Sequence, residues 1–273
     1  MKPAKFAYEK PRSLDAALRL LAGGGDGAKL IAGGQSLGPI LNFRLAQPEL
    51  LIDVRTLPEL AAVRDEGDAV FLGAATTHAA IEDGKVPDPT RGMLAAVART
   101  IAYRAVRNRG TLGGSLAHAD PAADWVNVMA LLDAEIVAQG PRGERRIGAP
   151  GFVRGPLATT LATDEIITGV RVPKLSARAR WGHYKFNRKP GEFAEAIGAV
   201  IHDPERGVAR AVIGATGDAP HVVADARAFA GGFDPAAADA ALDAAGLQRG
   251  SYERQVHFVA LKRASAQCAR PGP

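Results

Sequence analysis

The sequence contains only one cysteine, Cys268, among its 273 residues. A single thiol cannot form an internal disulfide, and alone it cannot hold an iron–sulfur cluster or a cysteine-rich zinc site, which need several cysteine ligands. If electrons move through such clusters, we therefore expect another chain to carry them. Cys268 itself falls in a C-terminal stretch that we expect to be weakly structured.

Long apolar runs are also missing. No segment reaches the roughly 18 unbroken apolar residues that a membrane span needs. The N-terminal residues MKPAKFAYEKPRSLD include no apolar stretch of the kind that a secretory signal contains. Together these two absences predict a cytoplasmic protein without a membrane span.

A strongly one-sided charge is absent as well. The formal net charge is +5, but 34 basic residues are scattered among 29 acidic ones, and aromatic residues make up only 5% of the chain. Such a composition argues against nucleic-acid binding, which favours clustered basic residues. The densest basic stretch, YRAVRNRG at residues 103–110, is expected to form a solvated or partner-facing loop.

Neither of two common nucleotide-binding motifs is present, because no GxGxxG opens a βαβ unit and no loop ends in Gly-Lys-Ser or Gly-Lys-Thr. The chain has instead two short glycine turns beside hydroxyl side chains, at residues 32–37 (AGGQSL) and 111–115 (TLGGS). Glycine permits close backbone approach, and rows of backbone N–H groups at such turns hold phosphate without lysine. Two separated turns suit the diphosphate of a dinucleotide lying in a cleft between two lobes.

The spacing of apolar residues predicts an α+β protein in three parts. We expect a first lobe at residues 1–55, a second lobe at 56–177 and a C-terminal α/β domain at 178–273. The C-terminal part should contain a three-stranded antiparallel sheet with helices, since three strand-like segments (RWGHYKFNR, AIGAVIHD and ARAVIGAT) precede two helical ones. In the second lobe, residues 92–102 and 121–134 are expected to form helices.

Three motifs in this order resemble the FAD-binding medium subunit of the xanthine dehydrogenase and carbon monoxide dehydrogenase family of molybdenum hydroxylases. They are AGGQSL, VRNRGTLGGSLAHADPAADW (106–125) and YKFNRKPGEFA (184–194). The resemblance extends from residue 1 to about residue 265. It implies the two-lobed FAD-binding fold shared with vanillyl-alcohol oxidase, followed by a smaller C-terminal domain.

The resemblance also implies a set of FAD-binding residues. The set comprises Leu30, Ile31, Ala32, Gly33, Gly34, Gln35, Ser36, Leu37, Ile101, Thr111, Leu112, Gly113, Gly114, Ser115, Asp124, Ile167, Lys185 and Phe193. Ser36, Thr111 and Ser115 are the expected side-chain donors to the diphosphate, beside the main-chain N–H groups. Several relatives have His in place of Gln35, and many have Asn in place of Ser115.

Several of these assignments leave a structural alternative open. Asp124 either accepts a hydrogen bond from a ribose or ribityl hydroxyl or is an ordinary acidic residue in the first turn of a helix. Asp120 is a possible N-cap of that helix before Pro121. Lys185 either stabilises negative charge on reduced flavin or a phosphate, or is a lysine on a strand surface.

The apolar positions leave similar alternatives. Ile101 and Ile167 either pack on the flavin or belong to the core. Phe193 matches a position where relatives carry an aromatic near the isoalloxazine ring. His78 is interpreted as a local turn partner and not as part of the site.

The resemblance implies an oxidoreductase subunit with FAD and without catalytic or metal-binding residues of its own. A small subunit with two [2Fe–2S] clusters would deliver electrons, a large molybdenum-cofactor subunit would oxidise the substrate, and FAD would reduce a terminal acceptor. The expected assembly is a dimer of heterotrimers. Two alternatives are a free-standing flavin-dependent oxidoreductase and a non-catalytic nucleotide-binding module.

Overall fold

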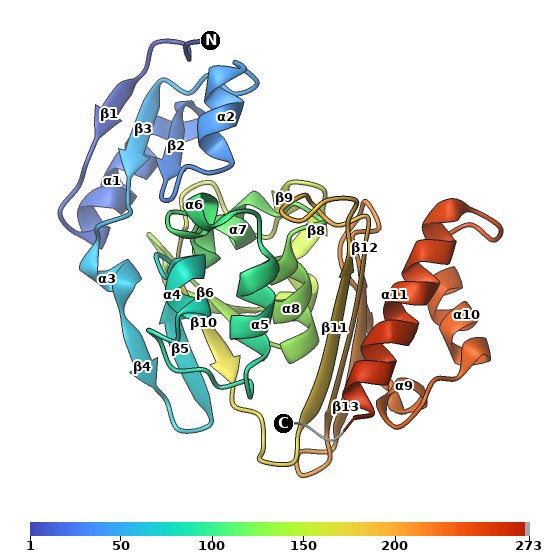
Figure 1. Ribbon diagram of the computed structural model, residues 1–273. Coiled ribbons are helices and arrows are strands. Elements are labelled where there is room, and N and C mark those ends of the chain that lie inside the picture. Colours follow the sequence, from blue (N-terminus) through green and yellow to red (C-terminus); the bar gives the residue numbers. More distant parts are fainter. Residues whose placement is uncertain (271–273) are drawn as a thin grey trace.

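The computed structural model describes residues 1–270, which form three main sheets, each with its own helices (Figure 1). The N-terminal sheet has the order β1-β3-β2, and both outer strands run parallel to β3. Its elements are β1 (Ala7–Glu9), α1 (Leu14–Gly24), η1 (Gly25–Gly27), β2 (Ala28–Ile31), α2 (Leu37–Asn42) and β3 (Leu50–Asp53). In parallel sheets ligands bind beyond the carboxyl ends of the strands, and the AGGQS loop leaves β2 at that end.

The central sheet is antiparallel and has the order β4-β5-β10-β6-β7. Its strands are β4 (Val63–Asp65), β5 (Ala69–Gly73), β6 (Glu135–Gly140), β7 (Gly143–Gly148) and β10 (Ile166–Pro173). The other elements of this part are α3 (Pro58–Ala61), α4 (His78–Glu82), α5 (Met93–Thr100), α6 (Arg104–Arg107), α7 (Leu112–His118), α8 (Asp124–Leu132), η2 (Ala149–Gly151), β8 (Val153–Gly155) and β9 (Ala158–Thr159).

Helix α8 lies at the centre of the molecule, with every residue buried. It packs against β12 and β13 of the C-terminal part as well as against α7 and β10. The helix begins at Asp124 with Ala123 as its N-cap, later than the predicted start at residue 121. Asp120 is therefore not the N-cap; its carboxylate accepts a hydrogen bond from the Ala122 amide at 2.9 Å in the preceding turn.

The C-terminal sheet is an antiparallel meander with four strands, β11 (Arg180–Phe186), β12 (Ala196–Asp203), β13 (Val208–Gly214) and β14 (His221–Val223). The prediction of three strands was wrong, because the sheet has a fourth strand, β14. The three residues of β14 are too few to show an alternating pattern, and they follow the turn-forming stretch GDAP at residues 217–220.

Helices α9 (Arg227–Ala230), α10 (Pro235–Ala244) and α11 (Tyr252–Cys268) cover one face of the C-terminal sheet, whose other face packs on α8 (Figure 1). Helix α11 lies directly on the sheet because two strand glycines leave room for it. A Cβ at Gly182 would lie 1.9 Å from the carbonyl oxygen of Ala264, and one at Gly198 would lie 2.5 Å from the carbonyl carbon of Ala260.

The basic stretch at residues 103–110, expected to be a solvated or partner-facing loop, is largely exposed but is not a loop throughout. It forms the short helix α6, whose arginines bind acidic residues of α4. Arg107 Nε lies 2.7 Å from Glu82 Oε2, and Arg104 Nη1 lies 2.6 Å from Asp83 Oδ1. These ion pairs fasten α6 to α4, and together the two helices form part of the wall described below.

Cys268 is the last residue of α11 and is buried, so the prediction of a weakly structured stretch there was wrong. Burial raises the pKa of the Cys268 thiol to about 11. Because the thiolate is the reactive form, the native protein should resist a thiol-specific chromogenic disulfide reagent at pH 8. In guanidinium chloride one thiol per chain should react. Rapid labelling of the native protein would contradict this packing.

No helix within residues 1–270 is both long enough and apolar enough to cross a lipid bilayer.

Candidate functional site

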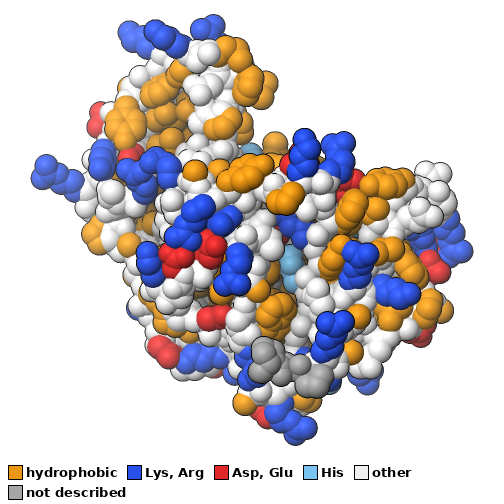
Figure 2. Space-filling model, viewed as in Figure 1, with side chains coloured by type: hydrophobic (Ala, Val, Ile, Leu, Met, Phe, Trp, Pro, Cys, Tyr) orange, Lys and Arg blue, Asp and Glu red, His pale blue; other side chains and the backbone are white. Residues whose placement is uncertain are grey.

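A cleft of about 800 Å³ lies between the N-terminal sheet and the central part of the molecule. In Figure 2 the outline of the molecule is notched where the N-terminal part rises above the rest. Strand β11 and the loop after it also contribute to the lining, through Lys185, Gly191 and Phe193. The volume lies within the range of about 300–1,000 Å³ that is usual for small-molecule and cofactor sites.

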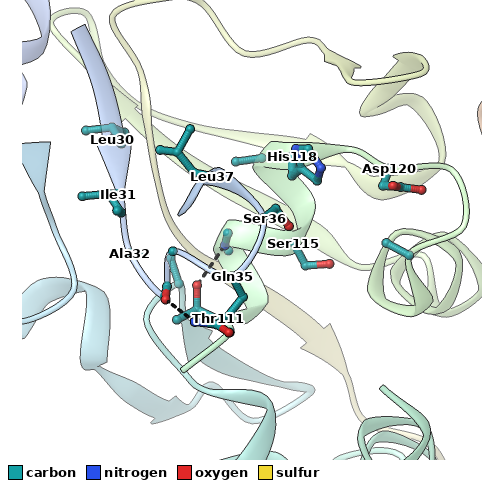
Figure 3. Close-up of a pocket in the computed structure, with 18 of the residues that line it drawn as sticks. Leu30, Ile31, Ala32, Gln35, Ser36, Leu37, Thr111, Ser115, His118 and Asp120 are labelled. Carbon is teal, nitrogen blue, oxygen red and sulfur yellow. Dashed lines mark hydrogen bonds between the residues drawn. The ribbon is translucent and has the colours of Figure 1, made fainter. Parts of the chain in front are cut away.

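The loop after β2, several of whose side chains are labelled in Figure 3, lines this cleft and contains a row of unused backbone donors. The N–H groups of residues 33–37 donate no hydrogen bond within residues 1–270. Gly34 has a φ of +69°, a conformation that glycine adopts without strain. Neighbouring backbone N–H groups that line an open cleft without a partner are suited to an external acceptor with several oxygens.

Gly33 brings the N-terminal loop into direct contact with the central part of the chain. A Cβ on Gly33 would lie 2.1 Å from the Arg109 carbonyl oxygen and 2.9 Å from the Gly110 Cα. The Gly33 carbonyl accepts a hydrogen bond from Gln35 Nε2 at 3.0 Å (Figure 3) and another from Arg109 Nε at 3.3 Å. Only glycine fits here, because both neighbours that a side chain would meet are backbone.

The second glycine turn is built differently, and the prediction that its amides form a free phosphate nest was wrong. It is the first turn of α7, and Thr111 is the N-cap. All four amides from Leu112 to Ser115 already have acceptors, namely Thr76 O (2.9 Å), Ala74 O (2.9 Å), Thr111 Oγ1 (3.1 Å) and Thr111 O (3.0 Å). The turn therefore offers the hydroxyls of Thr111 and Ser115 to the cleft.

All but one of the residues predicted to bind FAD line this single cleft. They are Leu30, Ile31, Ala32, Gly33, Gly34, Gln35, Ser36, Leu37, Ile101, Thr111, Gly113, Gly114, Ser115, Asp124, Ile167, Lys185 and Phe193. Leu112 is the exception, because its side chain is fully buried in the core under α7. Contact between these residues and a cofactor stays a prediction.

Asp124 and Lys185 form a buried ion pair in the cleft wall. Asp124, at the start of α8, is 4% exposed, and its Oδ2 accepts a hydrogen bond from Lys185 Nζ at 2.7 Å. The Lys185 side chain is only 7% exposed, so it is not a lysine on a strand surface. Coulomb attraction at this distance in a buried setting is much stronger than in water.

One oxygen of that carboxylate has no partner. Asp124 Oδ1 is sealed from solvent and accepts no hydrogen bond within residues 1–270. His183 Nε2 lies 4.0 Å from this oxygen and also lacks a partner. Burial lowers the pKa of His183, which keeps its ring neutral. Oδ1 is therefore an unpartnered acceptor just inside the cleft wall, and a hydroxyl in the cleft can reach it only if the Asp124 side chain turns outward.

The apolar positions of the predicted set differ in exposure. Ile167 in β10 is buried and Ile101 after α5 is half-buried, and both belong to the main core as well as to the cleft lining. Phe193 is 62% exposed, at the rim. The loop before it packs on Tyr103, since a Cβ at Gly191 would lie 2.8 Å from that ring.

Sequence reasoning missed several residues that line the cleft, among them His78, Tyr103, His118, Asp120 and Leu157. None of them stands in a glycine turn, and His78, Tyr103 and Leu157 reach the cleft from segments outside the three motifs. The three basic residues around Tyr103 made its segment resemble an exposed loop. His78 stands in the turn a few residues after strand β5, and that position was its only available sequence signal.

A mixed α/β chain whose parts enclose one deep cleft, with free amides at one end and a buried ion pair in the wall, has the architecture of a protein that binds an extended phosphate-bearing cofactor. Residues 4–175 match the family described as "FAD binding domain in molybdopterin dehydrogenase". The chain belongs to this family, as an FAD-binding medium subunit of the molybdenum hydroxylases.

Individual relatives support the same family assignment. Over 194 residues the chain is 42% identical to the 6-hydroxypseudooxynicotine dehydrogenase complex subunit alpha of Paenarthrobacter nicotinovorans, covering 71% of this chain and 66% of that one. Over 201 residues it is 39% identical to the carbon monoxide dehydrogenase medium chain of Hydrogenophaga pseudoflava, covering 74% and 70%. The solved carbon monoxide dehydrogenase of H. pseudoflava that lacks the Mo-pyranopterin moiety superposes with a TM-score of 0.89 at 34% identity, over 98% of both chains.

These relatives are dehydrogenase subunits, so the chain is an oxidoreductase subunit and FAD is its cofactor.

Proposed function

We propose that this chain is the electron-transfer subunit of a molybdenum-containing hydroxylase, taking electrons from the iron–sulfur clusters of a partner and passing them through FAD to a terminal acceptor. The observation that carries the proposal is the row of unpaired amides at residues 33–37. These residues line a cleft to which all three parts of the chain contribute. Within the cleft, FAD would supply a redox group that exchanges electrons with both partner and acceptor.

The residues present fit FAD at its diphosphate. The free amides of the first loop would hold the phosphate oxygens, and the hydroxyls of Ser36, Thr111 and Ser115 would donate beside them. Amide donors add no net charge, so the loop binds an anion without leaving a buried cation when the cleft is empty.

The wall of the cleft fits the remainder of the cofactor. Once the Asp124 side chain turns toward the cleft, its unpartnered Oδ1 would accept from a ribityl or ribose hydroxyl. Lys185 holds Asp124 in place and keeps the pair neutral overall. Ile101 and Ile167 would exclude water from the flavin, and Phe193 would close the exposed edge.

The proposal extends to domains and assembly. Residues 1–55 and 56–177 would be the two lobes of the FAD-binding unit, and 178–273 would be the C-terminal domain. The chain has one cysteine, which is buried, so the clusters would lie in a small subunit and the molybdenum cofactor in a large one. We propose a dimer of such heterotrimers in the cytoplasm, which fractionation of the native host would check.

The test is expression of the full chain, alone and together with the subunits encoded beside it. A yellow protein that releases FAD and not FMN on acid precipitation is expected, as identified by chromatography and mass spectrometry. In the complex, iron and molybdenum should co-purify with the other chains. A colourless protein in both contexts, or one that retains FMN or coenzyme A, would rule the proposal out.

A further inference from the structure

His78 is a buried histidine in the cleft wall that the cofactor set does not include. It is the first residue of α4, directly after the N-cap Thr77, and is 6% exposed. It lines the cleft beside Gly110 and Thr111, close to the point where the Gly33 loop meets the central part of the chain. The ring therefore lies near the free amides and not at the rim.

A single hydrogen bond fixes the tautomer of this ring. The indole Nε1 of Trp125 lies 2.9 Å from His78 Nδ1, and an indole nitrogen can only donate. His78 Nδ1 must therefore be the acceptor, and the proton of the neutral ring is on Nε2. Trp125 is fully buried in α8, so the core holds this donor in place.

The protonated nitrogen, Nε2, makes no hydrogen bond with the described part of the chain. It is not among the polar atoms sealed from solvent within residues 1–270. It lies 2.6 Å from where a Cβ on Gly110 would stand, so any side chain at position 110 would displace the ring. Burial, helped by the charge of Arg107, lowers the pKa of His78 to about 4, which keeps the ring neutral near pH 7.

The hydroxyls of Thr111 and Ser115 are the donors named so far on this side of the cleft, and His78 Nε2 would add a further one. The amides of the second glycine turn are all used internally, so donors from the central part of the chain must be side chains. We propose that His78 Nε2–H is a fixed, uncharged hydrogen-bond donor to a diphosphate oxygen of FAD, and that Trp125 sets the tautomer that makes it one. This inference rests on the proposed function.

Affinity measurements on the full chain, with its partner subunits if they are needed for loading, test the donor. His78→Leu should raise the dissociation constant for FAD about tenfold, the loss of roughly one hydrogen bond to a charged group. His78→Gln, whose amide can donate from a similar position, should lose less. His221→Leu is the matched control, because His221 in β14 does not line the cleft and should leave FAD affinity unchanged.

The tautomer has a separate readout that needs no variant. With ¹⁵N-labelled histidine, His78 should show a protonated Nε2 and a bare Nδ1, and the Nε2 resonance should shift when FAD is added. Trp125→Phe should give a mixture of tautomers and weaken FAD binding several-fold. The effect of His78→Leu on affinity should be constant between pH 6 and 8, because the ring does not titrate there.

The outcomes separate this inference from the proposed function. If the wild-type chain binds no FAD, either alone or with its partner subunits, the proposed function is wrong. If it binds FAD and folded His78→Leu binds equally well, or the Nε2 resonance does not move on loading, only the role of His78 is overturned. Should His78→Leu fail to fold, the resonances of the wild-type protein still decide.

Discussion

Gly33→Ala is expected to strip the protein of FAD, weakening binding by about 100-fold or more, which corresponds to roughly 2.7 kcal/mol. The added Cβ would lie 2.1 Å from the carbonyl oxygen of Arg109, and real Cβ atoms do not approach other atoms so closely. Since the obstacle is backbone, the Gly33 loop must move away from Arg109. That movement shifts the amides of residues 33–37, which are the proposed diphosphate donors.

Gly38→Ala is the matched control for this variant. Gly38 lies in α2, five residues further on, and a Cβ there would meet nothing within 4 Å. Alanine in a helix is favoured over glycine by up to about 1 kcal/mol, so this variant should keep FAD and melt at or slightly above the wild-type temperature. For both variants, flavin content after desalting gives the occupancy, and titration of the apoprotein with FAD gives the dissociation constant. A Gly33→Ala protein with full flavin occupancy would contradict the assignment.

The two glycine turns show where sequence reasoning stops. AGGQS and TLGGS share a glycine pair and a serine, and the backbone amides of both were expected to hold phosphate. Their difference lies in tertiary partners: Thr76 and Ala74, more than 30 residues earlier, accept from the amides of Leu112 and Gly113. In the first loop, Gly34 takes a positive φ, and the amides of residues 33–37 donate to no carbonyl in the described part of the chain. The sequence alone shows that both turns contain glycine. It does not show whether the glycine provides a positive φ, a close backbone contact or a free amide.

The same limit applies to the charged groups of the site. The motifs placed Asp124 and Lys185 in one cleft, and the structure confirms that both line it. Their bond to each other joins α8 and β11 across 61 positions of sequence, and neither residue's neighbours indicate it. Strand β14 and the buried Cys268 were missed for a related reason, since each is held by packing on elements that short patterns do not identify.

The ion pair of Asp124 and Lys185 makes the second large prediction. Lys185→Met should lower the free energy of unfolding by about 3–5 kcal/mol, because it leaves a buried carboxylate with no cation and with Oδ1 already unpartnered. Asp124→Asn should have a similar cost by leaving the ammonium unpaired. The double variant should cost clearly less than the sum of the two, since it removes both charges together.

An exposed ion pair on the same chain provides the comparison. Lys174 Nζ lies 2.6 Å from Asp65 Oδ1, but the Asp65 side chain is 65% exposed, so Lys174→Met should cost no more than about 1 kcal/mol. Urea unfolding of the apoprotein, followed by circular dichroism, gives all four values. If Lys185→Met lowered the free energy of unfolding no more than Lys174→Met does, water would have to reach the Asp124 carboxylate. The cleft wall would then lack the fixed acceptor that makes Asp124 a partner for the hydroxyls of FAD.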